Sequence, residues 1–219
     1  MADWIEWHRG YVDPRTPQAR RLPLVRAGIA EALSERAGRD ELRILSLCAG
    51  DGRDLLPELA RHPEPLGRAV LVELDPNLAK AARRRASSLG LARVAVVVGD
   101  AGSGDLLRPH LPVDLLLLCG IFGNLAVADL RRTIEVVPGM LRRGGWVIWT
   151  RGNRDPDIRE SIRRWFQAAG LVEHSFQGAP EAYGVGVNRL LGEATSLLRL
   201  PRRLFRFGPG PAPARPNSG

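Results

Sequence analysis

The stretch ILSLCAGDGRDL (44–55) decides the fold of this chain. It begins with an apolar run typical of a buried strand and continues into a turn that contains Gly50 and Gly52. Two glycines allow the backbone to turn tightly and to approach a ligand closely, although an ordinary strand–helix turn uses the same residues. A helix-like stretch follows and ends near Arg61. The segment is therefore predicted to form a strand, a glycine turn and a helix.

The same alternation recurs along the chain. Further apolar runs are AVLVEL (69–74), VAVVV (94–98), VDLLLLC (113–119) and WVIWT (146–150), mostly with helix-like stretches between them. Runs rich in Val, Leu and Ile are typical of parallel strands covered on both faces. A short loop joins the last two runs, 171–176 and 183–191, which indicates an antiparallel hairpin. We expect a doubly wound α/β fold, with a mostly parallel seven-stranded sheet, a C-terminal antiparallel edge hairpin and helices on both faces.

Length and composition favour one such domain. The 219 residues suit a single domain over residues 39–199, preceded by an N-terminal helical arm or lid at 1–38. Residues 200–219 are rich in Pro, Gly and Arg and contain no acidic residue, so a disordered basic tail is predicted. The net charge of +8 comes almost wholly from arginine, a pattern that resembles codon bias in a GC-rich genome and is a weak signal for nucleic acid.

The cysteines and the apolar runs of the sequence also bear on where the protein is located and whether it binds a metal. The two cysteines, Cys48 and Cys119, lie in apolar runs, which indicates reduced thiols and a cytoplasmic protein. No apolar run reaches the length of a membrane span, and the acidic first residues lack the pattern of a secretory signal. No spacing typical of metal ligands occurs, so no metal is expected. The oligomeric state stays open.

The end of the second predicted strand carries two acidic residues with different expected roles. Ligands of open α/β sheets bind beyond the carboxyl ends of the strands. Glu73 follows Gly50 by 23 residues, and a carboxylate at this position can accept hydrogen bonds from both hydroxyls of a ribose. Asp75 precedes Pro76 and is expected to cap the next helix.

The next two strand ends indicate an adenosine ligand. Asp100 can accept from an adenine amino group while the Ala101 N–H donates to the ring, or Asp100 only caps a turn. Gly120 and Gly123, after the fourth strand, allow close approach to a ligand. The dinucleotide pattern G-x-G-x-x-G is incomplete because Leu55 occupies its third glycine position, which disfavours NAD, and no phosphate-binding G-K-S/T sequence is present.

With these motifs, residues 40–192 resemble the class I S-adenosylmethionine-dependent methyltransferases. ILSLCAGDGRDL is similar to the family's first motif, usually an acidic residue followed by G-x-G-x-G, and the later strand ends are similar to the motifs that follow. Two positions depart from the pattern: Ser46 replaces the usual acidic residue and Cys48 the first glycine. Asp51 or Asp54 would then face the ammonium of the cofactor, unless these acids only cap the first helix. The resemblance implies that S-adenosylmethionine contacts Cys48, Ala49, Gly50, Asp51, Gly52, Asp54, Glu73, Leu74, Asp100, Ala101, Cys119 and Gly120.

The implied reaction is an in-line SN2 transfer of a methyl group to a small-molecule acceptor. An RNA or protein methyltransferase and a non-catalytic binder of adenosine ligands are the alternatives. The Asn/Asp-Pro-Pro-aromatic signature of many nucleobase methyltransferases is missing, since CGIFGN (119–124) stands there.

Acceptor-binding residues are predicted in two places. The N-terminal arm is aromatic, and the resemblance implies that it covers the cleft, with Trp7 and Tyr11 holding the acceptor and His8 or Tyr11 acting as a base. Packing of the arm onto the body is the alternative. Asn124 and Arg151 lie just past the fourth and fifth strands, and Arg151 suits an anionic group unless it is only solvated.

Overall fold

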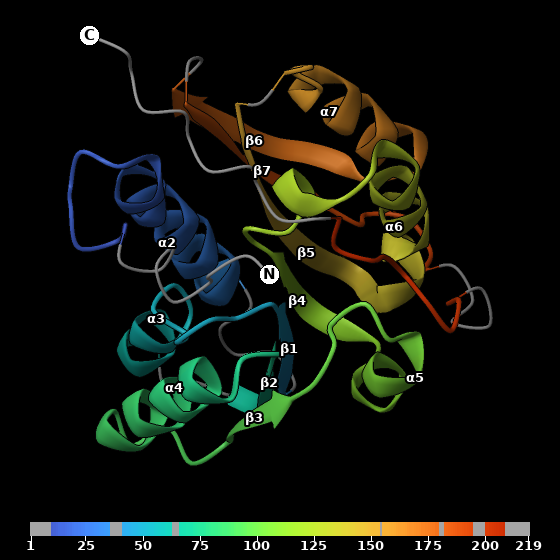
Figure 1. Cartoon of the computed structure of the whole chain (residues 1–219). Coiled ribbons are helices and arrows are strands. Elements are labelled where there is room, and N and C mark those ends of the chain that lie inside the picture. The colour runs from blue at the N-terminus through green and yellow to red at the C-terminus, as the bar shows by residue number, and fades with distance from the viewer. Residues whose placement is uncertain are drawn as a thin grey trace, which may run out of the picture.

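The computed structural model describes residues 10–35, 41–62, 66–153, 155–179, 182–194 and 200–208. A single seven-stranded sheet, with the order β3-β2-β1-β4-β5-β7-β6, forms its centre (Figure 1). The strands are β1 Leu42–Leu47, β2 Leu66–Glu73, β3 Val94–Val98, β4 Val113–Leu118, β5 Leu141–Gly152, β6 Val172–Ala179 and β7 Tyr183–Arg189. The predicted fold class is confirmed.

The sheet reverses its winding direction at β1. This strand pairs in parallel with β2 on one side and β4 on the other, so that Ile44 lies opposite both Ala69 and Leu115. The glycine turn after β1 and the loop after β4 therefore lie next to each other at the point where ligands of such sheets bind. At the far edge, β7 pairs antiparallel with β5 and with β6, which confirms the predicted hairpin.

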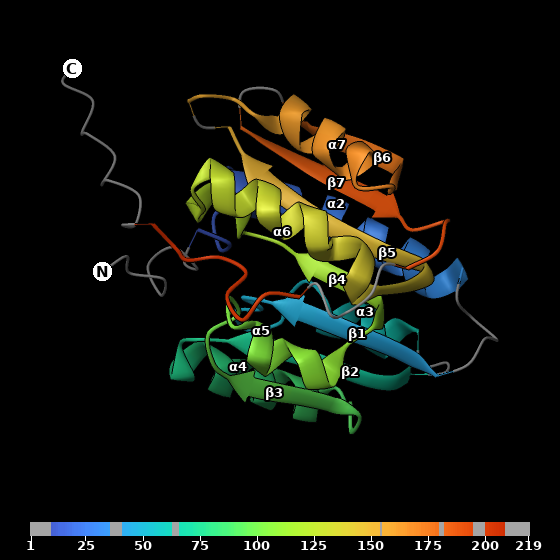
Figure 2. The same ribbon diagram turned by 90° about the vertical axis from the view of Figure 1, so that its right-hand side faces the viewer.

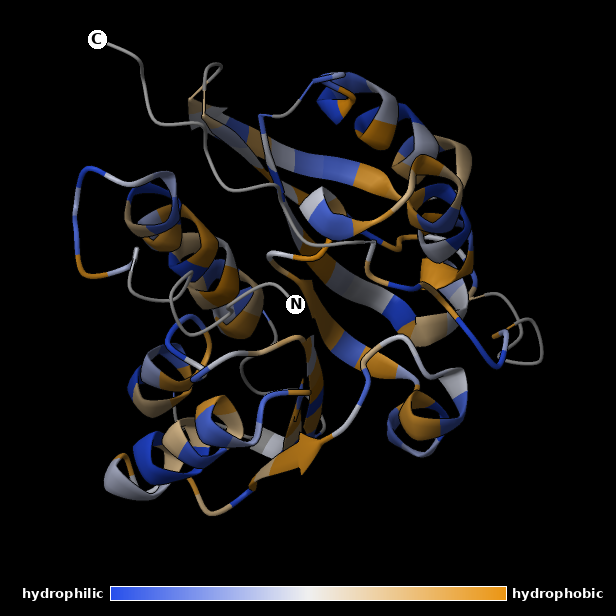
Figure 3. Ribbon diagram, viewed as in Figure 1, coloured by the Kyte–Doolittle hydropathy of each residue, from blue (hydrophilic) through white to orange (hydrophobic). Residues whose placement is uncertain are grey.

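Helices cover both faces of the sheet (Figure 2). One face carries α2 Pro17–Glu35, α3 Leu56–Arg61 and α4 Pro76–Ser88, and the other carries α5 Gly104–Leu107, α6 Val127–Met140 and α7 Arg159–Ala168. Strand side chains alternate between the two layers, since Trp146 and Ile148 of β5 pack on the α2 side and Val147 and Trp149 on the α6 side. Apolar residues accordingly line the strands and the inward helix faces (Figure 3).

Helix α2 is a layer of the domain and not a separate arm. Its Ile29 is fully buried, and a Cβ on Gly28 would lie 3.2 Å from the Val187 side chain of β7. The predicted boundary between an arm at 1–38 and a domain at 39–199 is wrong for this helix, because its apolar face completes the core over β5 and β7. Within the described ranges, no helix combines the length and the apolar character needed to cross a membrane.

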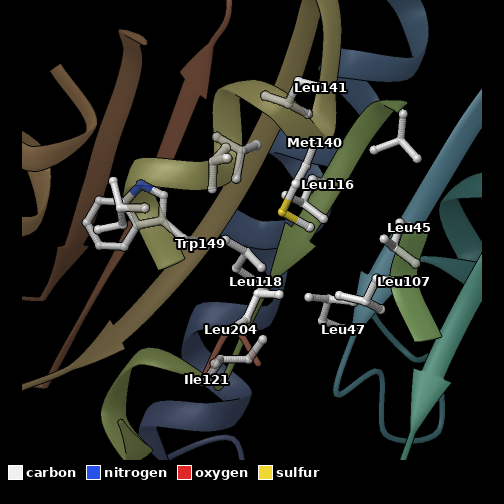
Figure 4. Packing of buried hydrophobic residues seen from close by; sticks show 14 of the residues in the cluster. Leu45, Leu47, Leu107, Leu116, Leu118, Ile121, Met140, Leu141, Trp149 and Leu204 are labelled. Carbon is white, nitrogen blue, oxygen red and sulfur yellow. The ribbon is translucent and has the colours of Figure 1, made fainter. Parts of the chain in front are cut away.

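Residues 200–208, here called the C-terminal strap, are packed on the body. Leu204 and Phe205 are buried, and Leu204 lies beside Ile121 in the α6-side core (Figure 4). The Leu204 N–H donates to the Gly102 carbonyl at 2.8 Å. The prediction of a disordered tail from residue 200 is therefore wrong for the strap. The strap is rich in Pro and Arg, but burial of the apolar residues between the arginines stabilises its docking on the core. Residues 209–219 lie outside the described residues.

Candidate cofactor and acceptor site

The glycine turn after β1 keeps a left-handed backbone at alternate residues. The φ angles are 52° at Cys48, 57° at Gly50 and 70° at Gly52. Cys48 thus adopts a conformation that favours glycine, so the turn retains the shape that the family motif builds with three glycines. A Cβ on Gly52 would lie 2.6 Å from Cδ1 of Leu56, which means that glycine is needed here for α3 to pack on the sheet.

Glu73 joins the end of β2 to this turn. Its Oε2 accepts from the Gly50 N–H at 2.7 Å and its Oε1 from the Asp75 N–H at 2.9 Å. The side chain is buried, and because a carboxylate oxygen can accept more than one hydrogen bond, both oxygens retain acceptor capacity for a ligand. Asp75 caps α4, as predicted, by accepting from the N–H groups of Asn77 and Leu78. Leu74, between the two acids, is exposed and offers an apolar surface beside the site.

Asp51 is held by arginines. Its carboxylate lies 2.8 Å from Arg53 Nη2 and 3.1 Å from Arg85 Nη2 of α4. Burial raises the pKa of Asp51, but the hydrogen bonds and charge of Arg53, together with the charge of Arg85, outweigh this and leave the pKa below its ordinary value. Asp51 therefore fastens the glycine turn to α4, and its charge is compensated within the protein.

Asp54 has different surroundings. Its Oδ1 accepts from the Leu55 N–H at 2.8 Å, and no side chain caps the start of α3. Burial raises the pKa of Asp54 against the opposing effect of that backbone hydrogen bond. Arg21 and Cys119 lie close enough to Asp54 to interact with it electrostatically. The charge of Arg21 lowers the pKa of Asp54. Burial raises the pKa of the Cys119 thiol, and the charge of Asp54 raises it further.

Tyr11 lies against the glycine turn from the N-terminal side. The Arg53 guanidinium lies 4.4 Å from the centroid of the Tyr11 ring, and Arg21 Nη2 donates to the Tyr11 hydroxyl at 3.3 Å. Burial raises the pKa of Tyr11 above 10.0. The hydroxyl is therefore neutral near pH 7, which suits a hydrogen-bond donor and disfavours a general base. Trp7 and His8 lie outside the described residues.

Asp100 and Ala101 follow β3. Asp100 Oδ1 accepts from the Gly102 N–H at 2.8 Å, so the turn-capping role weighed from the sequence is present. The other carboxylate oxygen pairs with Arg203 of the strap. Asp100 is half-exposed and Ala101 is buried. The geometry leaves the Asp100 carboxylate open to a ligand in addition to these two partners.

A cavity of about 190 Å³ lies beyond the ends of β4 and β5, beneath the start of α2. Gly120 forms part of its wall and is fixed from both sides, because its N–H donates to Thr150 Oγ1 at 2.8 Å and its carbonyl accepts from Asn124 Nδ2 at 2.9 Å. The lining residues are mostly small or polar: Pro17, Gln18, Arg21, Gly120, Gly123, Asn124, Thr150, Gly152, Asn153, Ala182 and Tyr183.

Of the predicted acceptor residues that the structure describes, Tyr11, Asn124 and Arg151, only Asn124 lines this cavity. Arg151 is buried and follows Thr150 in β5, so its side chain lies on the opposite face of the strand. Sequence reasoning missed Arg21 and Thr150. Thr150 ends the apolar run WVIWT, and its position at a strand end was an available signal, whereas nothing in the sequence around Arg21 distinguishes it from the neighbouring arginines.

Comparisons with known proteins agree with this fold. Residues 44–145 match the model of the family described as a methyltransferase domain. The fold is similar to that of magnesium protoporphyrin IX methyltransferase from Synechocystis PCC 6803 with bound S-adenosylmethionine, with a TM-score of 0.65, 10% identity, and coverage of 85% of this chain and 90% of that chain. It is also similar to an O-methyltransferase family protein from Burkholderia thailandensis, with a TM-score of 0.62, 17% identity, and coverage of 77% and 55%.

One curated protein shares a stretch of sequence with this chain. Over 100 residues, 46% of this chain, it is 33% identical to a gamma-glutamyl phosphate reductase from Hyphomonas neptunium (strain ATCC 15444). The matched part is only 20% of that protein, so this chain spans about a fifth of its length. The name of that protein therefore carries no statement about the activity of this one.

The family match covers just under half of the chain, and the solved structures establish its fold. Residues 44–145 match a methyltransferase domain, and the chain has the Rossmann-like fold that these S-adenosylmethionine-dependent methyltransferases share. The residues at the strand ends fit S-adenosylmethionine, since the left-handed glycine turn, the buried Glu73 carboxylate and the half-exposed Asp100 carboxylate lie along one edge of the sheet.

Proposed function

We propose that this protein transfers the methyl group of S-adenosylmethionine to a small-molecule acceptor bound in the cavity beyond β4 and β5. The observation that carries the proposal is the position of this cavity. Gly120 lines it and lies two residues beyond the end of β4, the strand next to β1, so the cavity adjoins the proposed cofactor site. When bound, the cofactor supplies a methyl group on a sulfonium. Transfer requires that the acceptor atom lies in line with the bond between the sulfur and that methyl group.

In this proposal, Glu73 accepts hydrogen bonds from the ribose hydroxyls, and Asp100 and Ala101 bind the adenine. The N–H of Gly50 holds Glu73 in place, and the left-handed turn from Cys48 to Gly52 keeps side chains away from the path of the ligand. Leu74, Cys119 and Gly120 provide the surfaces beside these polar groups. Both thiols are neutral, because burial raises the pKa of Cys48 and of Cys119, and they act only as apolar wall.

Asp54 is the proposed partner of the cofactor's ammonium group. Asp51 already pairs with two arginines, whereas the backbone N–H of Leu55 is the hydrogen-bond partner of Asp54 that the structure gives. A buried carboxylate with a raised pKa gains most from a cationic ligand, because the ligand stabilises its ionised form. Asp54 thereby takes the place of the acidic residue that Ser46 replaces in β1.

The size and lining of the cavity suit a small polar acceptor. About 190 Å³ is below the usual range of 300–1,000 Å³ for drug-sized ligand pockets. Gln18, Asn124 and Asn153 offer amide groups for orienting an acceptor, and Arg21 offers a positive charge. Tyr11 contacts Arg21 and Arg53 and closes the site from the N-terminal side, which helps to exclude water.

A turnover assay tests this proposal. The protein is incubated with S-adenosylmethionine labelled in its methyl group and with pools of small hydroxy, amino and thiol compounds, bulk RNA or a protein lysate. We expect label only in a small-molecule pool, and a Gln18→Leu variant, which removes a polar group from the cavity, should slow that transfer while leaving cofactor affinity unchanged. Label in RNA or protein would contradict the small acceptor. Cofactor binding without transfer to any pool would favour a non-catalytic binder.

A further inference from the structure

The C-terminal strap bridges the two loops that carry the proposed cofactor and acceptor residues. It forms an antiparallel bridge from Arg203 to Ser103 in the loop after β3, and another from Phe207 to Leu125 in the loop after β4. The Gly208 N–H also donates to the Asn124 carbonyl at 3.0 Å. Figure 2 shows the strap in red, between α5 and α6.

The loop after β3 has a sequence that fits the strap. A Cβ on Gly102 would lie 2.3 Å from the Phe205 carbonyl oxygen, and a Cβ on Gly104 would lie 1.9 Å from that of Pro201. Both distances are too short for any other residue without movement of the strap backbone. The two glycines of DAGSGD (100–105) therefore allow the strap to approach, in a loop whose first residue is the proposed adenine ligand Asp100.

Backbone hydrogen bonds on both sides of Arg203 fix its position next to Asp100. The residues on either side of it are fixed by backbone hydrogen bonds, with the Arg202 carbonyl accepting from Gly104 N–H at 2.9 Å and the Leu204 N–H donating to Gly102 at 2.8 Å. The Arg203 guanidinium pairs with one Asp100 oxygen, while Gly102 N–H donates to the other. With both oxygens engaged, the carboxylate has one orientation instead of several.

We propose that Arg203 is a positioning residue that makes the cofactor site select a 6-aminopurine. A fixed carboxylate accepts a hydrogen bond from an amino group and offers no donor to a 6-keto group, so an inosine-type ligand is penalised. Without Arg203 the half-exposed carboxylate turns toward water and the penalty falls. The inference rests on the proposed role of Asp100 at the adenine.

The test compares the calorimetric dissociation constants of S-adenosylhomocysteine and S-inosylhomocysteine. We expect Arg203→Gln to reduce the preference for the adenosyl ligand about fivefold, the effect of one hydrogen bond. Arg203→Lys, which keeps the charge, should restore part of the preference. Arg202→Gln is the matched control, because Arg202 pairs with the exposed Asp105 on the same strap and should leave the preference unchanged.

Asp100→Asn tests the same coupling without a change in the strap. It should lower the preference at least to the level of Arg203→Gln, and the double variant should lower it no further than Asp100→Asn alone. An unchanged preference in Arg203→Gln, an equal loss in Arg202→Gln, or independent losses in the double variant would overturn the inference alone. A wild-type protein that binds neither ligand would overturn the proposed cofactor site and the inference together.

Discussion

The Glu73 carboxylate accepts a hydrogen bond from the Gly50 N–H at 2.7 Å, and this contact joins the end of β2 to the glycine turn after β1. The second oxygen of Glu73 accepts from the Asp75 N–H, so the carboxylate is oriented before any ligand arrives. Preorganised acceptors of this kind bind a ligand without the entropy cost of ordering a mobile side chain.

Glu73→Gln should weaken cofactor binding. The amide places a donor opposite one of the two backbone N–H groups and loses the negative charge, so we expect a loss of about 1.5–3 kcal/mol in the binding of S-adenosylhomocysteine, measured by calorimetry. Asp75→Ala is the control. It should cost about 1 kcal/mol in unfolding free energy as a lost helix cap, with unchanged affinity. The reverse pattern would show that Asp75 is the ribose ligand.

The strap should contribute strongly to stability. Phe205 is buried, and Phe205→Ala should lower the unfolding free energy in urea by about 3–5 kcal/mol. A chain that ends after residue 199 should lose at least as much, whereas a chain that ends after Gly208 keeps every strap contact described and is the matched control. Wild-type stability of the chain that ends after residue 199 would contradict the packing of the strap.

Position 48 should tolerate substitution by glycine better than substitution by valine. At a φ of 52° a β-branched side chain clashes with its own backbone, so Cys48→Val should lower the unfolding free energy by about 1–3 kcal/mol. Cys48→Gly removes the Cβ from this left-handed position, and we expect it to be close to wild type or more stable by up to about 1 kcal/mol. Chemical denaturation of both variants decides this, and equal destabilisation by valine and glycine would show that side-chain packing outweighs the backbone.

Asp54 should make stability and cofactor affinity depend on pH in opposite directions. Burial raises its pKa in the folded state above 3.8, so the folded protein binds this proton more tightly than the unfolded chain does. Its contribution to stability is present below the unfolded pKa and is lost as pH rises through the raised folded pKa. A cationic ligand favours the ionised form, so affinity should rise with pH over the same range.

Asp54→Asn should remove both effects. Without ligand, the variant should be more stable than wild type above the raised pKa, and its affinity for S-adenosylhomocysteine should be weaker and independent of this titration. Urea unfolding and calorimetry between about pH 4 and pH 8 measure the two quantities. An affinity that still rises with pH in Asp54→Asn would assign the effect to another group.

The sequence predicted the sheet because central strands such as β1 and β4 are buried on both faces and so appear as uninterrupted apolar runs. It also predicted Glu73 and Asp100 as site residues, since strand order places the ends of β1 to β4 at one edge. The docking of the strap was not predictable from composition: the space for it depends on Gly102 and Gly104, about a hundred residues earlier in the chain. Arg21 enters the acceptor cavity only because α2 packs across β5 and β7, a contact without a local sequence signal.

The most direct test of the central claim is a calorimetric titration of the full chain with S-adenosylhomocysteine, with Glu73→Gln titrated in parallel. We expect one binding site with a dissociation constant of about 1–100 µM in the wild type, and at least about tenfold weaker binding in the variant. Absence of heat and of any thermal shift at millimolar ligand, or equal affinity in the two proteins, would contradict a cofactor site built on the ends of β1 and β2.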